Sequence, residues 1–314
     1  MSKPSVHVLG DLMVDIACGI ESLEALTAAR GSDLPTHARL TPGGSAANTA
    51  TWLARGGAAV TLIGAVGKDA LGDLLVYEIE KSGVLVNAER VAHELTGLCI
   101  VLNERNGERT MIPSPGANAH FSIPDLGLRL DTLKVTHVHV SAYMLFHETS
   151  GSTALEYMAY ARKSGATVSL DPSSSALVEQ HSERLLAAMS MTDILLSNTD
   201  EARELTRIMT GENHSFHEVD LKLLSAAMHQ REPMVVVTDG FGPVRALYQG
   251  DENYTSAVQK IEKVAATTGA GDAFNAGFLN AWLINRQIPN SIEAGSSLAA
   301  QVLAHIGATT ITTQ

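Results

Sequence analysis

The stretch VAATTGAGDAFNAGFL, from Val264 to Leu279, decides the fold because it joins an apolar lead-in, a glycine-rich turn and the start of a helix. Phe274, Phe278 and Trp282 recur at helical spacing and fall on one face. Small residues in the turn let backbone N–H groups approach an anion, and a helix N-terminus leaves such groups unpaired with a partial positive charge. The stretch therefore predicts a phosphate-binding turn at the beginning of a helix.

A carboxylate, Asp272, follows this turn. Because negative charges repel, it is not there to bind phosphate, and it suits a general base that takes a proton from a hydroxyl. An ordinary helix N-cap is the alternative interpretation. A Rossmann fingerprint is excluded because Phe274 occupies the position of its third glycine, and a P-loop is excluded because the chain has no Gly-Lys-Ser/Thr tripeptide.

The composition indicates a globular protein with a substantial core, and it disfavours nucleic-acid binding and a membrane span. The 314 residues are 45% apolar and carry a formal charge of −12, without a basic block. Two cysteines without a CxxC motif offer no zinc framework, and His137 and His139 alternate in a strand-like run that favours a structural role or exposure to solvent over a metal site. Because there is no signal peptide and no apolar run of about 20 residues, we expect a soluble cytoplasmic protein.

The first strand, Val6 to Gly10, precedes Asp15. In an open α/β sheet, ligands gather at the carboxyl ends of the strands, so Asp15 is a candidate for hydrogen bonds to substrate hydroxyls. A turn residue is the alternative. A glycine turn with Gly44 then runs into an alanine-rich helix, and Asn48 on its first turn has an amide that both donates and accepts.

Regular alternation of strands and helices follows residue 135. Strands are expected at 137–141, 167–171, 194–197 and 234–238, and helices at 151–164, 180–190, 199–210, 218–230, 272–285 and 291–304. Earlier, a hairpin around Asn106-Gly107 interrupts the alternation and suggests a small β appendage over a site. The pattern predicts an α/β fold with a mostly parallel central sheet and helices on both faces, in a single domain of residues 1–314.

Two strand ends in the second half carry polar groups. Asn198 and Glu201 have the spacing of a capping box, and they could also orient the waters of a phosphate-bound Mg²⁺. Thr238-Asp239-Gly240 could touch a nucleotide, although an ordinary turn explains it equally well.

Together these motifs closely resemble the ribokinase-like (PfkB) family of carbohydrate and nucleoside kinases. The early signature is GGSAANTA, Gly43 to Ala50, and the late one is TTGAGDAFNAG, Thr267 to Gly277. The family's N-x-x-E motif matches Asn198 to Glu201, and Thr238 to Gly240 is similar to its strand-end nucleotide contact. The resemblance covers essentially the whole chain, with both signatures in the right order and spacing.

The resemblance implies a ribokinase-like fold with a small β-sheet lid from about 12–41 and 96–118, and an ATP- and Mg²⁺-dependent phosphotransferase. It implies that Asp272 is the catalytic base and that the backbone N–H groups of Gly269, Ala270 and Gly271 form an anion hole. The matching substrate-binding positions are Asp15, Gly44 and Asn48, and the matching Mg-ATP positions are Asn198, Glu201, Thr238 and Gly240.

Two positions depart from the family's pattern. Ser45 stands where ribokinase proper carries Lys, which weakens an assignment to that enzyme. Ala266 stands where the family usually has Asp, in a loop that binds an activating K⁺ in many members. Because alanine supplies no carboxylate ligand, we expect weak or absent activation by a monovalent cation.

A sugar kinase is the expected function, because aromatic residues make up 4% of the chain and none lies between Val14 and Leu40 in the first lid segment. A nucleoside kinase of the adenosine type is the alternative in the same class. A catalytically silent sugar sensor would lack the base, and a nicotinamide-dependent oxidoreductase would need GxGxxG in the first βα turn. The expected partners are a sugar or nucleoside, ATP, and a second copy of the chain through the lid.

Overall fold

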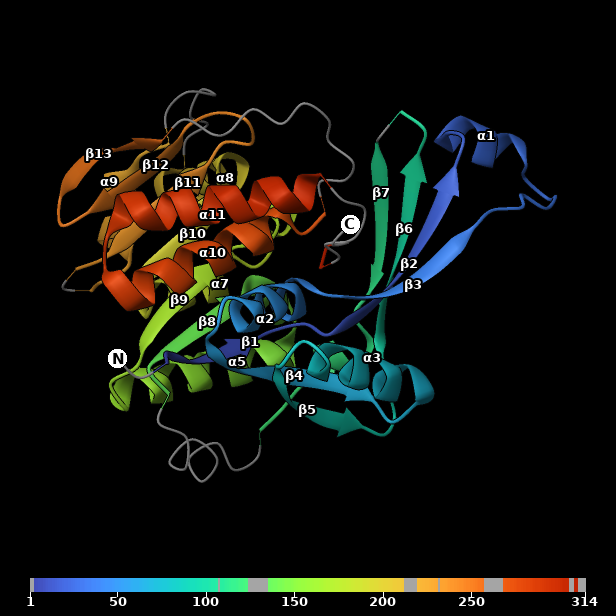
Figure 1. Ribbon diagram of the computed structural model, residues 1–314, viewed down its shortest axis with the longest axis horizontal. Helices are drawn as coiled ribbons and strands as arrows, with labels where there is room; N and C mark the ends of the chain where they lie inside the picture. Colours follow the sequence, from blue (N-terminus) through green and yellow to red (C-terminus); the bar gives the residue numbers. More distant parts are fainter. Residues whose placement is uncertain are drawn as a thin grey trace.

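The computed structural model describes residues 3–106, 108–123, 135–211, 219–230, 232–256, 268–304 and 308–309. Its main body is a nine-stranded sheet with the order β13-β12-β11-β10-β9-β8-β1-β4-β5 (Figure 1). The strands are β1 (Ser5–Leu9), β4 (Ala59–Gly67), β5 (Leu85–Val91), β8 (His137–Ser141), β9 (Thr167–Asp171), β10 (Ile194–Asn198), β11 (Met234–Thr238), β12 (Val244–Tyr248) and β13 (Asp251–Ser256). All neighbours from β11 to β5 pair in parallel, and β12 and β13 add an antiparallel edge.

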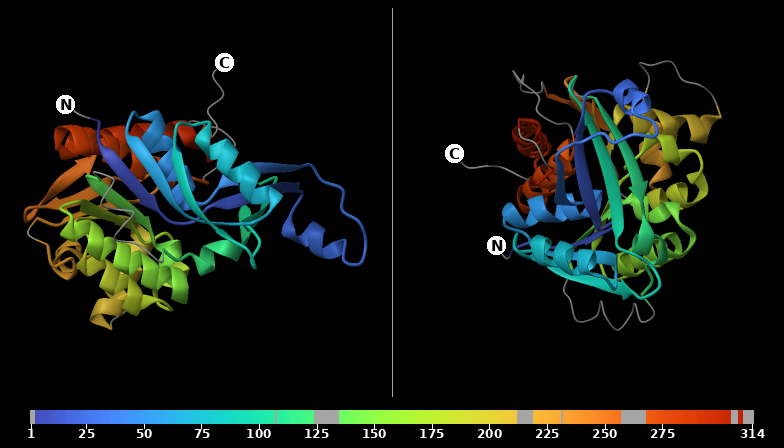
Figure 2. Two further views of the ribbon diagram at one scale, coloured as in Figure 1. Left: turned by 90° about the horizontal axis from the view of Figure 1, so that it is seen from below. Right: turned by 90° about the vertical axis from the view of Figure 1, so that its right-hand side faces the viewer.

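Helices cover both faces of this sheet, as the two rotated views show (Figure 2). One face packs on α2 (Ser45–Arg55), α3 (Ala70–Glu80), α10 (Ala270–Asn285) and α11 (Ile288–Leu303). The other packs on η2 (Ala142–Phe146), α5 (Glu148–Lys163), α6 (Ser175–Val178), α7 (Ser182–Ser190), α8 (Thr199–Thr210) and α9 (Leu221–Ala227). Along β1, Val6 and Val8 enter the first core and Leu9 enters the second, so alternate side chains serve opposite layers.

Histidines on the central strands are structural. His7 forms a 2.5 Å hydrogen bond with the Tyr157 hydroxyl, and His137 and His139 each lie 2.8 Å from the Ser169 hydroxyl. Burial lowers the pKa of all three histidines, so they are neutral in the folded protein. His7 joins the sheet to α5, and His137 and His139 join β8 to its neighbour β9.

A second sheet of four strands, with the order β3-β2-β6-β7, stands away from the main body (Figure 1). Its strands are β2 (Met13–Ile20), β3 (Ala38–Gly43), β6 (Gly97–Glu104) and β7 (Arg109–Ser114), with α1 (Leu23–Ala28) between the first two. The chain enters it after β1, leaves it into α2, re-enters after β5 and leaves again into η1 (Gly116–His120). This small sheet is the lid, and each of its four connections reaches the carboxyl-terminal side of the main sheet or the start of a helix there.

The sequence prediction of an α/β fold with a mostly parallel sheet and a lid is confirmed. The strands expected at 137–141, 167–171 and 234–238 have the observed bounds of β8, β9 and β11. Helix α9 is shorter than the helix expected at 218–230, and the antiparallel hairpin of β12 and β13 was not expected. Gly107 of the expected hairpin turn lies outside the described residues, as do the apolar lead-in and Ala266. None of the described helices is long and apolar enough to span a membrane.

Candidate active site

A cavity of about 610 Å³ opens between the lid and the carboxyl ends of the main strands. Nine of the eleven site residues expected from the sequence line it: Asp15, Gly44, Asn48, Asn198, Glu201, Thr238, Gly269, Gly271 and Asp272. Ala270 and Gly240 are not among its lining residues. Residues from both ends of the chain therefore converge at one place, as expected for an open α/β sheet whose ligands bind beyond the strand ends.

The turn before α10 is fixed by a glycine in a left-handed conformation. Gly269 is the N-cap of α10 with φ 78°, a left-handed conformation that favours glycine. A Cβ at this position would lie 2.5 Å from the Ala308 Cβ, so space as well as conformation requires glycine. The first hydrogen bond of the helix runs from Ala273 N–H to the Gly269 carbonyl, which leaves the preceding N–H groups without an intrahelical acceptor.

Asp272 lies on the first turn of α10, and two side chains of α2 hold its carboxylate. The Ser45 hydroxyl donates to Oδ1 at 2.8 Å, and the Asn48 amide donates to Oδ2 at 2.8 Å. The other amide atom, Asn48 Oδ1, is buried without a hydrogen-bond partner, and the residue faces the cavity. Asn48 thus orients the expected base and keeps an acceptor atom available for a ligand hydroxyl.

The start of α2 is fixed by Asp11, a residue to which the sequence analysis gave no role. Asp11 accepts hydrogen bonds from Ser45 N–H at 3.2 Å and Ala46 N–H at 3.3 Å. Gly44, the N-cap of α2, has φ 96°, and a Cβ there would lie 2.5 Å from the Asp11 carbonyl oxygen. Asp11 therefore sets the position of the helix that carries Ser45 and Asn48.

The cavity is rich in carboxyl groups, and their burial disfavours the charged form. Burial raises the pKa of Asp272 to about 8, and the charge of Asp171 adds to the rise. Burial likewise raises the pKa of Asp15 to about 6, with the charge of Asp11 as the second cause. Groups with such raised pKa values in a cleft are typical of a site that handles protons or binds a cation.

Asp15 lies on β2 of the lid and is 9% exposed. Gly43 on the neighbouring strand β3, where it pairs with Met13, leaves the room for the Asp15 carboxyl group, because a Cβ there would lie 2.4 Å from the carboxyl atoms. Asp15 is thus not the turn residue of the alternative interpretation. It is a buried strand carboxylate that lines the cavity on the lid side.

At the opposite end of the cavity lies the pair Asn198 and Glu201, for which the sequence predicts a capping box or a role at a phosphate-bound Mg²⁺. Asn198 and Glu201 form a complete capping box at the start of α8: Glu201 N–H donates to Asn198 Oδ1 at 2.9 Å, and Asn198 N–H donates to Glu201 Oε2 at 3.0 Å. Both residues also line the cavity, so the two interpretations, cap and ligand group, describe the same side chains.

Asp171 is the carboxylate that sequence reasoning missed at this end. It ends β9, is 7% exposed, and accepts hydrogen bonds from Asn275 Nδ2 at 2.8 Å and Ser173 N–H at 2.7 Å. Burial raises its pKa well above the ordinary value, and the charge of Glu201 adds to this rise. Asp171 stands at the carboxyl end of the strand predicted at 167–171, and this position was the feature of the sequence that could have identified it as a site residue.

Three comparisons place the chain among known proteins. The model of the pfkB family of carbohydrate kinases matches residues 3–314. The ribokinase of Haemophilus influenzae is 28% identical over 261 residues, which are 82% of this chain and 79% of that protein. The fructokinase of Escherichia coli is 28% identical over 282 residues, covering 87% and 83% of the two chains. The crystal structure of Anopheles gambiae adenosine kinase has a TM-score of 0.83 at 23% identity, with 96% of each chain covered.

The raised pKa of Asp272 predicts that this residue destabilises the protein at alkaline pH. With a folded-state pKa of about 8 against an ordinary 3.8, the folded protein keeps a proton that the unfolded chain releases, so this contribution to stability is lost as the pH rises through that window. Asp272→Asn should therefore raise the melting temperature relative to wild type by at least about 2 °C at pH 8.5, and by less at pH 5. Thermal unfolding of both proteins across this range measures the difference.

Asp33→Asn is the matched control, because Asp33 is exposed. Its melting temperature should follow that of the wild type at every pH. A difference between Asp272→Asn and wild type that does not vary with pH would contradict the raised pKa.

Proposed function

This chain belongs to the pfkB family of carbohydrate kinases, and from that premise we propose that it is a sugar kinase that transfers the γ-phosphate of ATP to a sugar hydroxyl. The observation that carries the proposal is the placement of the Asp272 carboxylate. It lies at the N-terminus of α10, beside a glycine turn with unpaired N–H groups, and α2 holds it in place. Base, anion cradle and hydroxyl-binding groups thus face one cavity.

In the proposed reaction Asp272 is the general base. The acceptor hydroxyl oxygen attacks the γ-phosphorus, the bond from that phosphorus to the β,γ-bridging oxygen breaks, and ADP leaves. The hydroxyl proton passes to the Asp272 carboxylate. Ser45 and Asn48 fix the carboxylate by hydrogen bonds to its two oxygens, which keeps one orientation for proton transfer.

The backbone N–H groups of Gly269, Ala270 and Gly271 form the proposed anion hole. They precede the first intrahelical hydrogen bond of α10, and the helix dipole adds partial positive charge at this end. Such preorganised donors stabilise the charge on the transferring phosphoryl group without reorganisation during the reaction.

The residues at the far end of the cavity suit Mg²⁺, which prefers oxygen ligands and retains several of its waters. Glu201 and Asp171 offer buried carboxyl oxygen atoms there, and Asn198 offers an exposed amide oxygen. Burial raises the pKa of both carboxyl groups, and a nearby cation would favour their charged forms. Bound Mg²⁺ would supply positive charge that offsets the charge of the phosphates. These side chains would hold the hydrated ion, and Thr238 would contact the nucleotide, as would Gly240.

The charges of the cavity favour a neutral sugar over an acidic or phosphorylated acceptor. Its lining includes five carboxyl groups, from Asp11, Asp15, Asp171, Glu201 and Asp272, against the guanidinium of Arg109. Two lining histidines, His147 and His181, have pKa values lowered by burial and so add little positive charge. Carboxylates accept hydrogen bonds from hydroxyl groups, whereas they repel a second anion.

The lining of the lid also favours a sugar over a nucleoside. Its described residues at the cavity include Met13, Asp15, Cys99, Arg109, Met111 and Pro113, none of which is aromatic. A nucleoside kinase is the second candidate, because Tyr143 and Phe146 line the other wall and their rings meet edge to face at 5.9 Å. A purine or pyrimidine base could stack there.

A screen of acceptors tests the proposed function directly. Release of ADP is followed with neutral pentoses, hexoses, sugar phosphates, sugar acids and nucleosides, each at the same concentration with Mg-ATP. We expect a neutral sugar to give the highest kcat/KM. Higher kcat/KM for a nucleoside would establish the second candidate, and higher kcat/KM for a phosphorylated sugar would contradict the charge argument.

Asp272→Asn should lower kcat by about 10²–10⁴-fold, because a positioned general base contributes an effect of this size. Binding of ATP, measured by calorimetry, should stay near that of the wild type. A kcat close to the wild-type value would show that another group takes the proton.

Asp15→Ala should raise the KM or Kd of the sugar far more than that of ATP. A buried hydrogen bond between a carboxylate and a hydroxyl contributes about 1.5–3 kcal/mol, or roughly a 10- to 150-fold change in affinity. Asp15→Asn should recover part of the loss, because its amide still offers an oxygen acceptor. Calorimetry that shows unchanged sugar affinity in both variants would remove Asp15 from the substrate site.

Weak or absent activation by K⁺ remains a proposal, because Ala266 lies outside the described residues. A loop without the usual carboxylate would bind the ion through neutral carbonyl groups alone and hold it weakly. Assays with K⁺ against a large organic cation at constant ionic strength measure the effect, and Ala266→Asp should increase it. Saturable activation of the wild type at low millimolar K⁺ would contradict the proposal.

A homodimer formed through the lid is also proposed. Leu40 and Ile112, on the two outer strands of the small sheet, are 55% and 50% exposed. Burial of such apolar side chains against a second copy would stabilise the pair. Light scattering that gives the mass of one chain at micromolar concentration would contradict it.

A further inference from the structure

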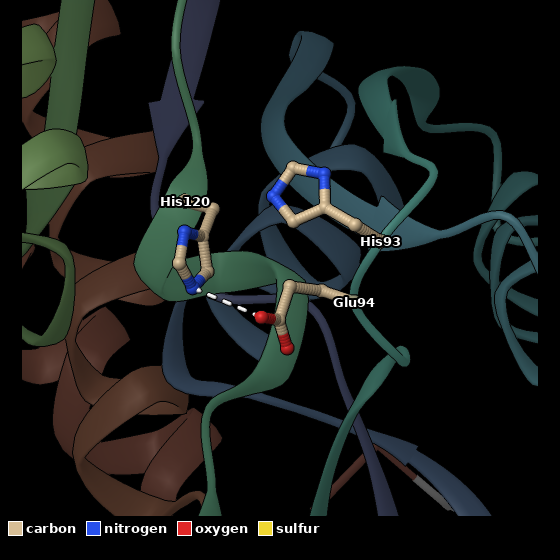
Figure 3. A group of neighbouring side chains, drawn as sticks. All are labelled: His93, Glu94 and His120. Atoms are coloured by element: carbon tan, nitrogen blue, oxygen red, sulfur yellow. Dashed lines mark ion pairs between the residues drawn. The ribbon is translucent and has the colours of Figure 1, made fainter.

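Three side chains with metal-binding atoms meet outside the catalytic cavity. His93 and Glu94 belong to the connection between β5 and β6, and His120 ends η1 (Figure 3). One ligand atom from each lies within 4.8 Å of the others. The His120 Nε2 atom lies 3.3 Å from Glu94 Oε1, and the rings of His93 and His120 are 5.6 Å apart and nearly perpendicular.

These distances fit the ligand set of a zinc ion. Zn²⁺ binds imidazole nitrogen and carboxylate oxygen at about 2.0–2.2 Å with tetrahedral angles, so two of its ligand atoms lie roughly 3.3 Å apart. The pair from His120 and Glu94 already has this separation. His93 needs a further approach of about 1.5 Å at most, which a rotation of its exposed side chain supplies.

The backbone brings the two segments together before any ion binds. Ala117 N–H donates to the Leu95 carbonyl at 2.8 Å, which joins η1 to the 92–96 connection. Gly116 permits this approach, because it has φ 51° and a Cβ there would lie 2.3 Å from the Leu95 oxygen. Such preorganisation of backbone removes most of the ordering cost of a metal site on two separate segments.

We propose that His93, Glu94 and His120 bind one Zn²⁺ ion, with water as the fourth ligand. Two nitrogen ligands favour Zn²⁺ over Mg²⁺, which prefers oxygen, so this ion is distinct from the one that accompanies ATP. None of these three residues lines the catalytic cavity, so the zinc site is separate from the place where the sugar acceptor would bind.

The proposed ion would join the two connections of the β6–β7 hairpin to the main body. The 92–96 connection enters this hairpin of the lid, and the residues before η1 leave it. Asn118, within η1, hydrogen-bonds both the N–H and the carbonyl group of Leu12 at the start of β2. A metal link between His93, Glu94 and His120 would therefore stiffen the base of the lid.

Calorimetric titration of the tag-free full chain with ZnCl₂ tests the site. We expect saturable binding that His93→Ala and His120→Ala each weaken by at least about 10-fold, while MgCl₂ at the same concentrations does not displace Zn²⁺. His37→Ala is the matched control, because His37 is exposed and directly precedes β3, far along the chain from His93, Glu94 and His120. Equal Zn²⁺ affinity in wild type and in both cluster variants, or equal loss in His37→Ala, would overturn the proposal.

Hydrogen exchange tests the link to the lid. Zn²⁺ should slow exchange of the amides in 92–97 and 115–120 in the wild type, and it should leave them unchanged in the His93→Ala, His120→Ala double variant. The melting temperature of the wild type should also rise with Zn²⁺ concentration, as expected for a ligand that binds the folded state. Zinc binding without slower exchange in these segments would overturn the stiffening, although the ion site itself would stand.

Discussion

The two hydrogen bonds that Ser45 and Asn48 make to the Asp272 carboxylate hold the site together. They join residues more than two hundred positions apart, at the N-termini of α2 and α10. Each helix start is itself fixed by a glycine with positive φ, Gly44 or Gly269, and that of α2 also by Asp11. The N-terminus of α10 offers N–H groups without an intrahelical acceptor, whereas Asp11 accepts hydrogen bonds from the Ser45 and Ala46 N–H groups at the start of α2.

This arrangement has an energetic cost that its function explains. Asp272, Asp171 and Glu201 are carboxyl groups with pKa values raised by burial, and their mutual repulsion adds to that rise. A cavity selected for stability alone would replace them with neutral groups. In the proposed reaction the same features would suit Asp272 to accept a proton and the far end of the cavity to bind a cation.

The sequence predicts the part of this fold that local patterns govern. Strands β8 (HVHVS) and β9 (TVSLD) alternate apolar with polar residues, which is the period of a strand, and the glycine turn before α10 carries its own conformational signal. The lid strand β2 was expected only through the family resemblance, within the lid segment of about 12–41, because Ala17, Cys18 and Gly19 have weak strand preference and gain their partners from β3 and β6. Similarly, the roles of Asp11 and Asp171 depend on hydrogen bonds to distant segments, and His120 is separated by 26 residues from the Glu94 it contacts.

The first two connections of the lid lie beside residues of the candidate active site. Asp11 lies on the first connection and Gly44 on the second, and together they position α2. Gly97 follows the third connection as the first residue of β6, where a Cβ would lie 2.4 Å from Asn118 Nδ2, and Gly116 follows the fourth with its own close backbone contact. A side chain at these positions would collide with neighbouring atoms, so the lid connections pack closely against the elements that they join. Asp11 links the first connection to the start of α2 through its hydrogen bonds with Ser45 and Ala46 N–H. The same helix start carries Ser45 and Asn48, so the packing at the base of the lid also supports the two side chains that hold the Asp272 carboxylate.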